Sequence, residues 1–184
     1  TRVNVFSCSC CPPNVVRMLS SIPRYAYTID GNHLYSNQFM DSTTTFEADG
    51  KPAHLTLKTR YPIDGKLEFS YTGAPITLHV RIPDWCVEYN SPIQNGFAVF
   101  QLTDGDSITV DLPMEVHFLE ANPNVQDDSG RYAVQRGPIV YCMEEIDNGE
   151  NLRDVTLLEN SEMRVVMEES IPAPVIYIGA ERRP

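Results

Sequence analysis

Three cysteines lie within four positions near the start of the sequence: Cys8, Cys10 and Cys11. Soft thiolates packed this closely suit Zn²⁺, which binds four ligands drawn from cysteine, histidine and carboxylate side chains. The nearest histidine, His33, lies beyond the next predicted helix, and no second cysteine cluster follows downstream. A metal at this cluster would therefore need at least one ligand from elsewhere.

The same cluster is placed for nucleophilic chemistry. Pro12-Pro13 follows it and is a typical helix start, and the apolar residues from Val15 to Ile22 recur at helical spacing. The positive end of a helix dipole stabilises a thiolate, as does a bound metal. The alternative is that the cysteines are small buried apolar residues, the common fate of a free cysteine.

Other residue types with catalytic potential are expected to be structural. Each histidine falls singly in a separate strand-like segment, so no ligand role is assigned to His33, His54, His79 or His117. Neighbouring carboxylates on a strand point to opposite faces, which argues against a two-carboxylate glycosidase site at Asp127-Asp128, Glu144-Glu145 or Glu168-Glu169. The single tryptophan, Trp85, is expected to anchor a core, as are the isolated Cys86 and Cys142.

The elements that carry these residues are one helix and many strands. The helical spacing ends before Pro23, and from Tyr25 onward the pattern alternates with a period of two. Clear strand-like runs cover 53–58, 66–71, 76–82 and 105–112, and turn dipeptides with glycine separate them. The predicted fold class is therefore all-β, an antiparallel β-sandwich preceded by one short helix. Pro113 is expected to close a sheet edge.

Beyond this sandwich a polar stretch without apolar periodicity covers 122–130 and is interpreted as a linker. Further strands are predicted at 132–136, 139–143, 164–167 and 175–178, too few for a full second sandwich. The predicted organisation is a helical tail at 1–27, a β-sandwich at 28–121, the linker, and a smaller or incomplete β domain at 131–184. Because the sequence begins without Met at Thr1, we expect a piece of a longer chain.

Composition excludes several classes of function. A formal charge of −11 with only 14 lysines and arginines argues against a nucleic-acid partner. No apolar run approaches the length needed to cross a bilayer, so no membrane partner is expected. Five cysteines make a poor disulfide framework, and no Asn-x-Ser/Thr acceptor occurs, which favours a reducing, cytoplasmic compartment.

The segment Cys8-Ser9-Cys10-Cys11-Pro12-Pro13-Asn14 resembles the Cys-x-Cys-Cys-Pro-Pro-Asn signature of the β-L-arabinofuranosidases of glycoside hydrolase family 127, once grouped as a domain of unknown function. Three further segments, 81–86, 105–114 and 135–142, are similar to segments of that family and occur in the same order. The resemblance covers most of residues 1–150.

This resemblance implies an upstream (α/α)6-barrel catalytic domain of which the chain holds only the tail. It implies that Cys10 is the nucleophile of the parent enzyme and that Cys10 and Cys11 share a Zn²⁺ ion. The remaining ligands, a cysteine and a glutamate, and the general acid/base glutamate would lie upstream, outside this chain. The implied reaction is double displacement with retention on an arabinofuranoside. The resemblance gives Cys8 no role.

Two functional hypotheses follow. The first is a fragment of a zinc-dependent arabinofuranosidase that is inactive by itself and binds zinc weakly or not at all. The second is a non-catalytic β-sandwich module for structural support, homodimer formation or carbohydrate binding; exposed Tyr61, Tyr71 or Trp85 would favour sugar binding, and burial would favour support. An autonomous zinc-ribbon-like site is disfavoured because no second cysteine pair follows.

Overall fold

The structure, a computed structural model, describes residues 10–158, 161–169 and 171–182. The chain forms two compact units, Thr1–Pro113 and Met114–Pro184, which are described separately below. No helix within the described ranges combines the length and apolar character needed to cross a membrane.

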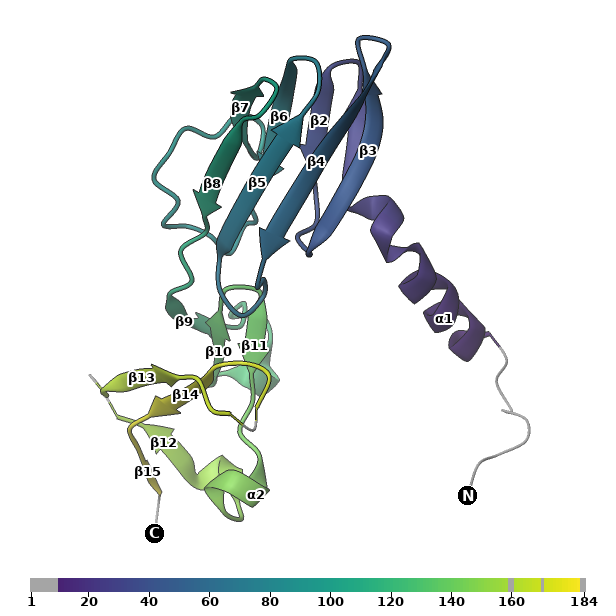
Figure 1. The fold of residues 1–184 in the computed structure, drawn as a ribbon. Coiled ribbons are helices and arrows are strands. Elements are labelled where there is room, and N and C mark those ends of the chain that lie inside the picture. Colours follow the sequence, from purple (N-terminus) through teal and green to yellow (C-terminus); the bar gives the residue numbers. More distant parts are fainter. Residues whose placement is uncertain (1–9, 159–160, 170, 183–184) are drawn as a thin grey trace. The chain divides into compact units, whose positions relative to one another are not determined.

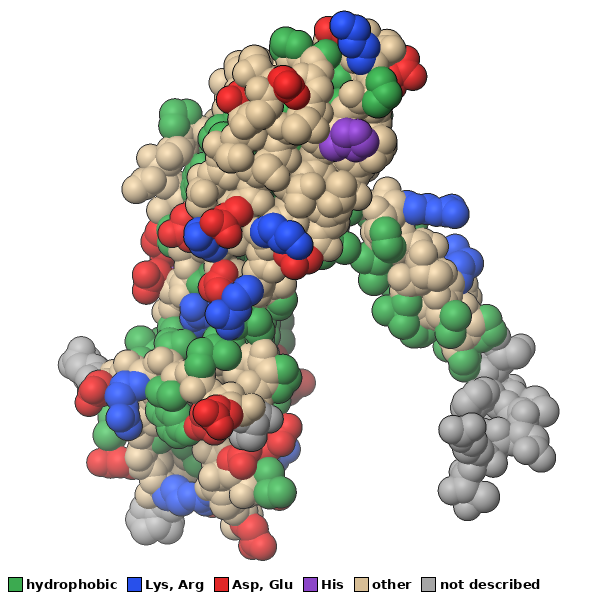
Figure 2. All heavy atoms as spheres, viewed as in Figure 1, with side chains coloured by type: hydrophobic (Ala, Val, Ile, Leu, Met, Phe, Trp, Pro, Cys, Tyr) green, Lys and Arg blue, Asp and Glu red, His purple; other side chains and the backbone are tan. Residues whose placement is uncertain are grey.

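The predicted helix is present as α1 (Cys11–Ser21), with proline in its first turn. It continues as the short 3-10 helix η1 (Ile22–Tyr25), in which Pro23 lacks the N–H that an α-helix would use. No residue of α1 is buried, and its apolar side chains lie in the open (Figure 2). Val15, Val16, Met18 and Leu19 are all at least 58% exposed.

The rest of the first unit is a sandwich of two four-stranded sheets (Figure 1). One sheet has the order β1 (Tyr27–Asp30), β2 (His33–Ser36), β6 (Ile76–Arg81), β7 (Phe97–Leu102). The other has the order β3 (Ser42–Ala48), β4 (Lys51–Thr59), β5 (Lys66–Thr72), β8 (Ser107–Asp111). The predicted all-β fold with one preceding helix is confirmed.

One pairing in the sandwich is parallel and differs from the antiparallel expectation. β2 pairs with β6 in parallel, while the other strand pairs of both sheets are antiparallel. The chain leaves the first sheet after β2, forms β3, β4 and β5 in the second sheet, and returns to the first as β6. A crossover of this kind lets β6 run in the same direction as β2.

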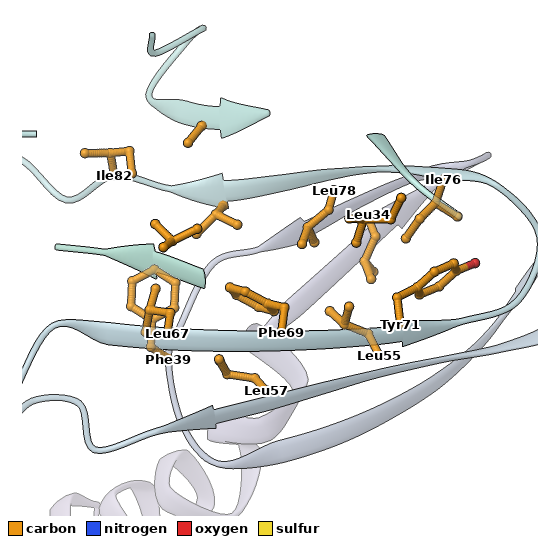
Figure 3. Packing of buried hydrophobic residues seen from close by; sticks show 14 of the residues in the cluster. Leu34, Phe39, Leu55, Leu57, Leu67, Phe69, Tyr71, Ile76, Leu78 and Ile82 are labelled. Carbon is orange, nitrogen blue, oxygen red and sulfur yellow. The ribbon is translucent and has the colours of Figure 1, made fainter. Parts of the chain in front are cut away.

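The sandwich core comes from alternating side chains on facing strands (Figure 3). Along β5, for example, Leu67, Phe69 and Tyr71 are buried while the residues between them are exposed. Cys86 is 4% exposed and Trp85 packs against the same cluster, so both predictions of core placement are confirmed. The buried core therefore lies between the two sheets of the first unit.

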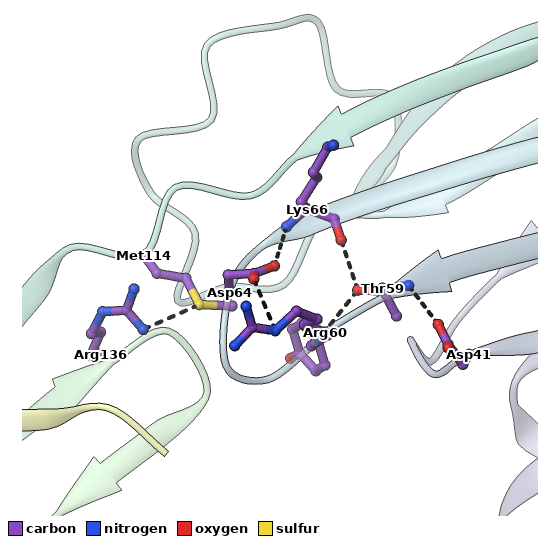
Figure 4. A network of polar contacts seen from close by, with 8 residues as sticks. Asp41, Thr59, Arg60, Asp64, Lys66, Met114 and Arg136 are labelled. Atoms are coloured by element: carbon purple, nitrogen blue, oxygen red, sulfur yellow. Dashed lines mark hydrogen bonds and ion pairs between the residues drawn. The ribbon is translucent and has the colours of Figure 1, made fainter. Parts of the chain in front are cut away.

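The loop between β4 and β5 is held by side-chain hydrogen bonds (Figure 4). Thr59 N–H donates to Asp41 Oδ1 at 2.7 Å, and Thr59 Oγ1 donates to the Lys66 carbonyl at 2.7 Å. Lys66 N–H donates to Asp64 Oδ1 at 3.2 Å, and Arg60 lies 3.8 Å from the same carboxylate.

Strand β8 lies at one edge of this sheet. This confirms the prediction that Pro113 follows an edge strand.

The second unit consists of small sheets. β9 (Val116–Glu120), β10 (Tyr132–Arg136) and β11 (Ile139–Tyr141) form a three-stranded sheet, and two strand pairs follow, β12 (Val155–Leu157) with β15 (Ala180–Arg182) and β13 (Met163–Val166) with β14 (Val175–Ile178). The short helices are η2 (Gln126–Asp128), α2 (Glu145–Asn148) and η3 (Leu152–Asp154). Every large apolar side chain described in this unit is at least partly exposed.

The border between the units lies after Pro113, whereas the sequence placed residues up to 121 in the first sandwich. The reason is that β9 pairs with β10, so both strands belong to the second unit. The polar stretch 122–130 connects these two paired strands and contains η2. Cys142 directly follows β11 and is exposed, so the prediction that it is a core residue is wrong.

Candidate functional site

The described part of the cysteine cluster lies at the start of α1. Cys10 occupies the N-cap position of this helix without a side-chain capping hydrogen bond, and Cys11 is the first residue of the helix. Their sulfur atoms are 3.5 Å apart, and both side chains are exposed. Two thiols side by side at an exposed helix start form a pair that one metal ion can bridge. Cys8 lies outside the described residues.

Polar contacts fix the backbone beside the pair. Asn14 Nδ2 donates to the Cys10 carbonyl at 2.7 Å. The Oδ1 atom of the same amide accepts two hydrogen bonds from Arg17, from Nε at 3.2 Å and Nη2 at 2.9 Å. Arg17 therefore orients Asn14, and Asn14 orients the peptide that carries Cys10. Neither residue is predicted from the sequence to have a role, although Asn14 belongs to the signature segment.

The pair provides only part of a metal site. Among the residues that the structure describes, no group of three or more histidine, cysteine, aspartate or glutamate side chains is placed to hold a metal ion. A tetrahedral zinc site needs four ligands. Cys10 and Cys11 would supply two of them, so a zinc ion at this pair would need further ligands.

Two histidines that the sequence treated as isolated lie together. His33 Nδ1 and His79 Nε2 are 3.0 Å apart, on the paired strands β2 and β6. The expectation that each lies alone is wrong for this pair, because a parallel pairing across 46 residues brings them together. His54 bonds Thr45 instead, with its Nδ1 atom 3.0 Å from the hydroxyl, and His117 lies half-buried in β9.

The acidic pairs lie mostly at the surface, as expected for solvated carboxylates. Both members of Asp127-Asp128 and of Glu144-Glu145 are exposed, as predicted. Glu168 differs, because it is half-buried and accepts a hydrogen bond from the Tyr177 hydroxyl. This hydrogen bond raises the pKa of Tyr177 and ties the carboxylate to a neighbouring strand.

Of the three aromatic residues proposed as sugar platforms, one is buried and the other two are partly buried against the core. Tyr71 is 1% exposed, and its hydroxyl donates to the Ala74 carbonyl. Tyr61 and Trp85 stack on each other with centroids 6.4 Å apart, and both pack against the core. Burial raises the pKa of Tyr61. Their placement favours a supporting role over carbohydrate binding at these residues.

Comparison with known families matches each unit separately. The model of the GH127 middle domain of β-L-arabinofuranosidases matches residues 33–114. The model of the glycoside hydrolase family 127 C-terminal domain matches residues 116–175. The border between the two matches lies within three residues of the border between the two compact units.

Individual relatives agree. A non-reducing end β-L-arabinofuranosidase from Bifidobacterium longum subsp. longum is 35% identical over 86% of this chain, which covers 27% of that protein. The crystal structure of a GH127 β-L-arabinofuranosidase from Geobacillus stearothermophilus T6 matches with a TM-score of 0.86 and 34% identity over 99% of this chain and 32% of its own. A second GH127 β-arabinofuranosidase structure gives a TM-score of 0.86 and 27% identity, over 96% of this chain and 33% of its own. The chain thus spans a third or less of the length of these relatives.

Proposed function

Because the chain belongs to glycoside hydrolase family 127, we propose that it is the carboxyl-terminal portion of a retaining, zinc-dependent β-L-arabinofuranosidase whose nucleophile is Cys10. The relatives named as β-L-arabinofuranosidases support the reaction and the sugar. The signature segment that contains Cys10, Cys11 and Asn14 supports the role of the cysteine pair. The rest of the catalytic machinery would belong to the part of the relatives that this chain does not cover.

The spacing of the two sulfur atoms is the observation that carries the proposal. At a Zn–S distance of about 2.3 Å, sulfurs 3.5 Å apart subtend roughly 100° at the metal, close to the tetrahedral angle. Adjacent cysteines at this distance fit two positions of one zinc site without rearrangement. The donor set of Cys10 and Cys11 therefore suits the metal, and two further ligands would complete it.

In the proposed reaction, the Cys10 sulfur attacks the anomeric carbon of the arabinofuranoside. The S–C bond forms as the bond to the leaving oxygen breaks, and a carboxylic acid outside this chain protonates that oxygen. Water then displaces the sulfur from the sugar and loses a proton to the same carboxylate, so that two inversions give net retention. When bound, Zn²⁺ supplies stabilisation of the thiolate, which serves the first step and makes sulfur a better leaving group in the second.

Asn14 and Arg17 act in this scheme as positioning residues. The Asn14 amide holds the carbonyl of Cys10, and Arg17 holds the amide in the orientation that allows this bond. A small displacement of a nucleophile from its productive geometry is costly in rate. The polar contacts at the start of α1 thus fix the backbone from which the nucleophile projects.

The test compares the full-length parent enzyme with two single-cysteine variants on an aryl β-L-arabinofuranoside. Cys10→Ala should lower turnover at least about 1,000-fold, because loss of a nucleophile removes the covalent pathway. Cys142→Ala is the matched control, since Cys142 is exposed and lies in the other unit, and it should keep full activity. Undiminished turnover by Cys10→Ala would refute the assignment. The isolated 184-residue chain should give no turnover, and measurable hydrolysis by it would refute the proposed need for the remaining machinery.

The second candidate is a supporting role for the sandwich without sugar binding. The observation that favours it is the burial of Tyr71 and the packing of the partly buried Tyr61 and Trp85 against the core. Affinity electrophoresis of the chain in gels containing arabinose-rich glycans should show no retardation. Retardation that is lost in Trp85→Ala would overturn this assignment.

A further inference from the structure

The outer face of the first sandwich carries two histidines in direct contact. His33 Nδ1 and His79 Nε2 are 3.0 Å apart, and the two residues lie on adjacent strands β2 and β6. Both side chains point away from the core, because Leu34, Leu78 and Val80 fill the inner face of the same strands. Neither histidine has a part in the proposed arabinofuranosidase reaction.

We propose that His33 and His79 form a binding site for a divalent transition-metal ion of the Cu²⁺ and Ni²⁺ type, separate from the cysteine pair. Imidazole nitrogens bind such metals at about 2.0–2.1 Å, and two nitrogens 3.0 Å apart at that distance subtend roughly 94° at the metal. An angle near 90° is that of adjacent ligands in the square-planar or tetragonal sites preferred by Cu²⁺ and Ni²⁺. Tetrahedral Zn²⁺ fits less well. Water would fill the remaining positions.

The sheet and neighbouring rings hold one of the two imidazoles in place. Tyr35 stacks on His79 with centroids 4.3 Å apart and an interplanar angle of 15°. Phe97 contacts the ring of His79 edge-on at 6.1 Å and also contacts Tyr35. A ligand whose ring is already packed loses little side-chain entropy on binding. This pre-organisation distinguishes the pair from two histidines that merely share a surface.

Metal binding would replace the hydrogen bond between the two rings. In the metal-free pair one nitrogen donates a proton to the other. Metal binding needs both contacting nitrogens as lone-pair donors, so the proton moves to the opposite nitrogen of its own ring and none is released. The hydrogen bond and the metal thus exclude each other.

Fixed charges beside the pair offset one another. Asp30 is the register partner of His33 on β1, so its carboxylate is on the same face. Arg81 follows His79 by two positions on β6 and is exposed on that face too. The two imidazoles therefore dominate binding. The chain should bind Cu²⁺ more tightly than Ni²⁺, as the Irving–Williams series predicts. Its affinity for Ni²⁺ should fall further when either imidazole is replaced.

The test is calorimetric titration of CuCl₂ and NiCl₂ into the full 184-residue chain in which Cys8, Cys10, Cys11 and the exposed Cys142 are replaced by serine, so that these thiols cannot compete. His33→Gln and His79→Gln keep a polar, hydrogen-bonding side chain but cannot chelate with the partner imidazole. Since loss of an outer-shell partner alone costs about 10–100-fold in affinity, each variant should raise the Kd for Cu²⁺ at least tenfold. His54→Gln is the matched control, because His54 lies on the other sheet beside Thr45, and its Kd should not change.

Paramagnetic broadening of amide signals gives a second readout. Sub-stoichiometric Cu²⁺ should broaden the signals of β2, β6 and β7 around His33 and His79 and leave those of β3 and β4 sharp. Unchanged Cu²⁺ affinity in a chain carrying both His33→Gln and His79→Gln would overturn the proposal. So would broadening centred away from the pair, or an equal loss of affinity in His54→Gln.

Discussion

Replacing Gly65 by alanine should destabilise the first sandwich by more than its small size suggests. A Cβ atom at Gly65 would lie 1.9 Å from the carbonyl oxygen of Leu112 and 2.8 Å from its carbon. This is roughly 1.5 Å inside van der Waals contact. The two segments cannot simply separate, because Leu112 N–H donates to the Gly65 carbonyl at 3.0 Å and the Leu112 side chain is 1% exposed.

The expected cost has two parts. Overpacking of a tightly packed region costs about 1–3 kcal/mol, and loss or stretching of the backbone hydrogen bond adds about 1 kcal/mol. We therefore expect Gly65→Ala to lower the free energy of unfolding of this unit by about 2–4 kcal/mol. With a urea m-value of about 2 kcal/mol/M, the midpoint should fall by about 1–2 M.

Urea unfolding followed by tryptophan fluorescence measures this directly. Trp85 is the single tryptophan of the chain and packs against the core of the first unit, so its emission reports that unit. Gly105→Ala is the control: Gly105 has a φ of +84° but open space around its Cβ position, so it should lose only about 1–2 kcal/mol to backbone strain. A midpoint for Gly65→Ala equal to or above that of Gly105→Ala would refute the reasoning from the close approach.

Further predictions concern the packing of the first unit and the reactivity of its buried cysteine. Leu78→Ala should lower the free energy of unfolding by about 2–5 kcal/mol because Leu78 is completely buried, whereas Met18→Ala on α1, 65% exposed, should change it by less than about 0.5 kcal/mol in the fluorescence assay. Burial, with smaller effects of Glu88 and Asp111, raises the pKa of the Cys86 thiol from 9.0 to about 11, so iodoacetamide at pH 8 should label Cys142 in the folded chain and spare Cys86. Because the folded state raises the pKa of Cys86, the protonated thiol stabilises the fold fully below about pH 9, and this stabilisation is lost as the pH rises to about 11. Between pH 9 and 11 the urea midpoint of the parent chain should therefore fall. The midpoint of Cys86→Ala should fall less over the same range.

Local patterns in the sequence were sufficient for most elements of the fold. Period-two alternation predicted β4, β5, β6 and β8 within a few residues, and the glycine dipeptides marked their turns because Asp49 and Asn95 adopt positive φ there. The helix start followed from proline in its first turn. These features depend on the conformational preferences of residues that are neighbours in the sequence, so the residue types alone predict them.

Contacts between segments that are distant in the sequence could not be predicted from these local patterns. The parallel pairing of β2 with β6 depends on a crossover through the other sheet, so nothing near His33 indicates that His79 lies beside it. The polar stretch 122–130 looked like a linker because polarity alone does not distinguish a linker from a loop between paired strands. Exposure of Cys142 likewise depends on where β11 ends, after only three residues.

The two proposed metal sites differ in how well the chain itself pre-organises them. His33 and His79 are held by a complete sandwich, whereas Cys10 and Cys11 depend on α1, an 11-residue helix with no buried residue. Helices of this length are marginal in water without tertiary packing. The apolar side chains of α1, such as Val16 at 66% exposure, would provide that packing if the remainder of a family 127 enzyme covered them. Order at the cysteine pair would then depend on the rest of the enzyme, which explains in physical terms why the isolated chain should neither hold zinc tightly nor hydrolyse an arabinofuranoside.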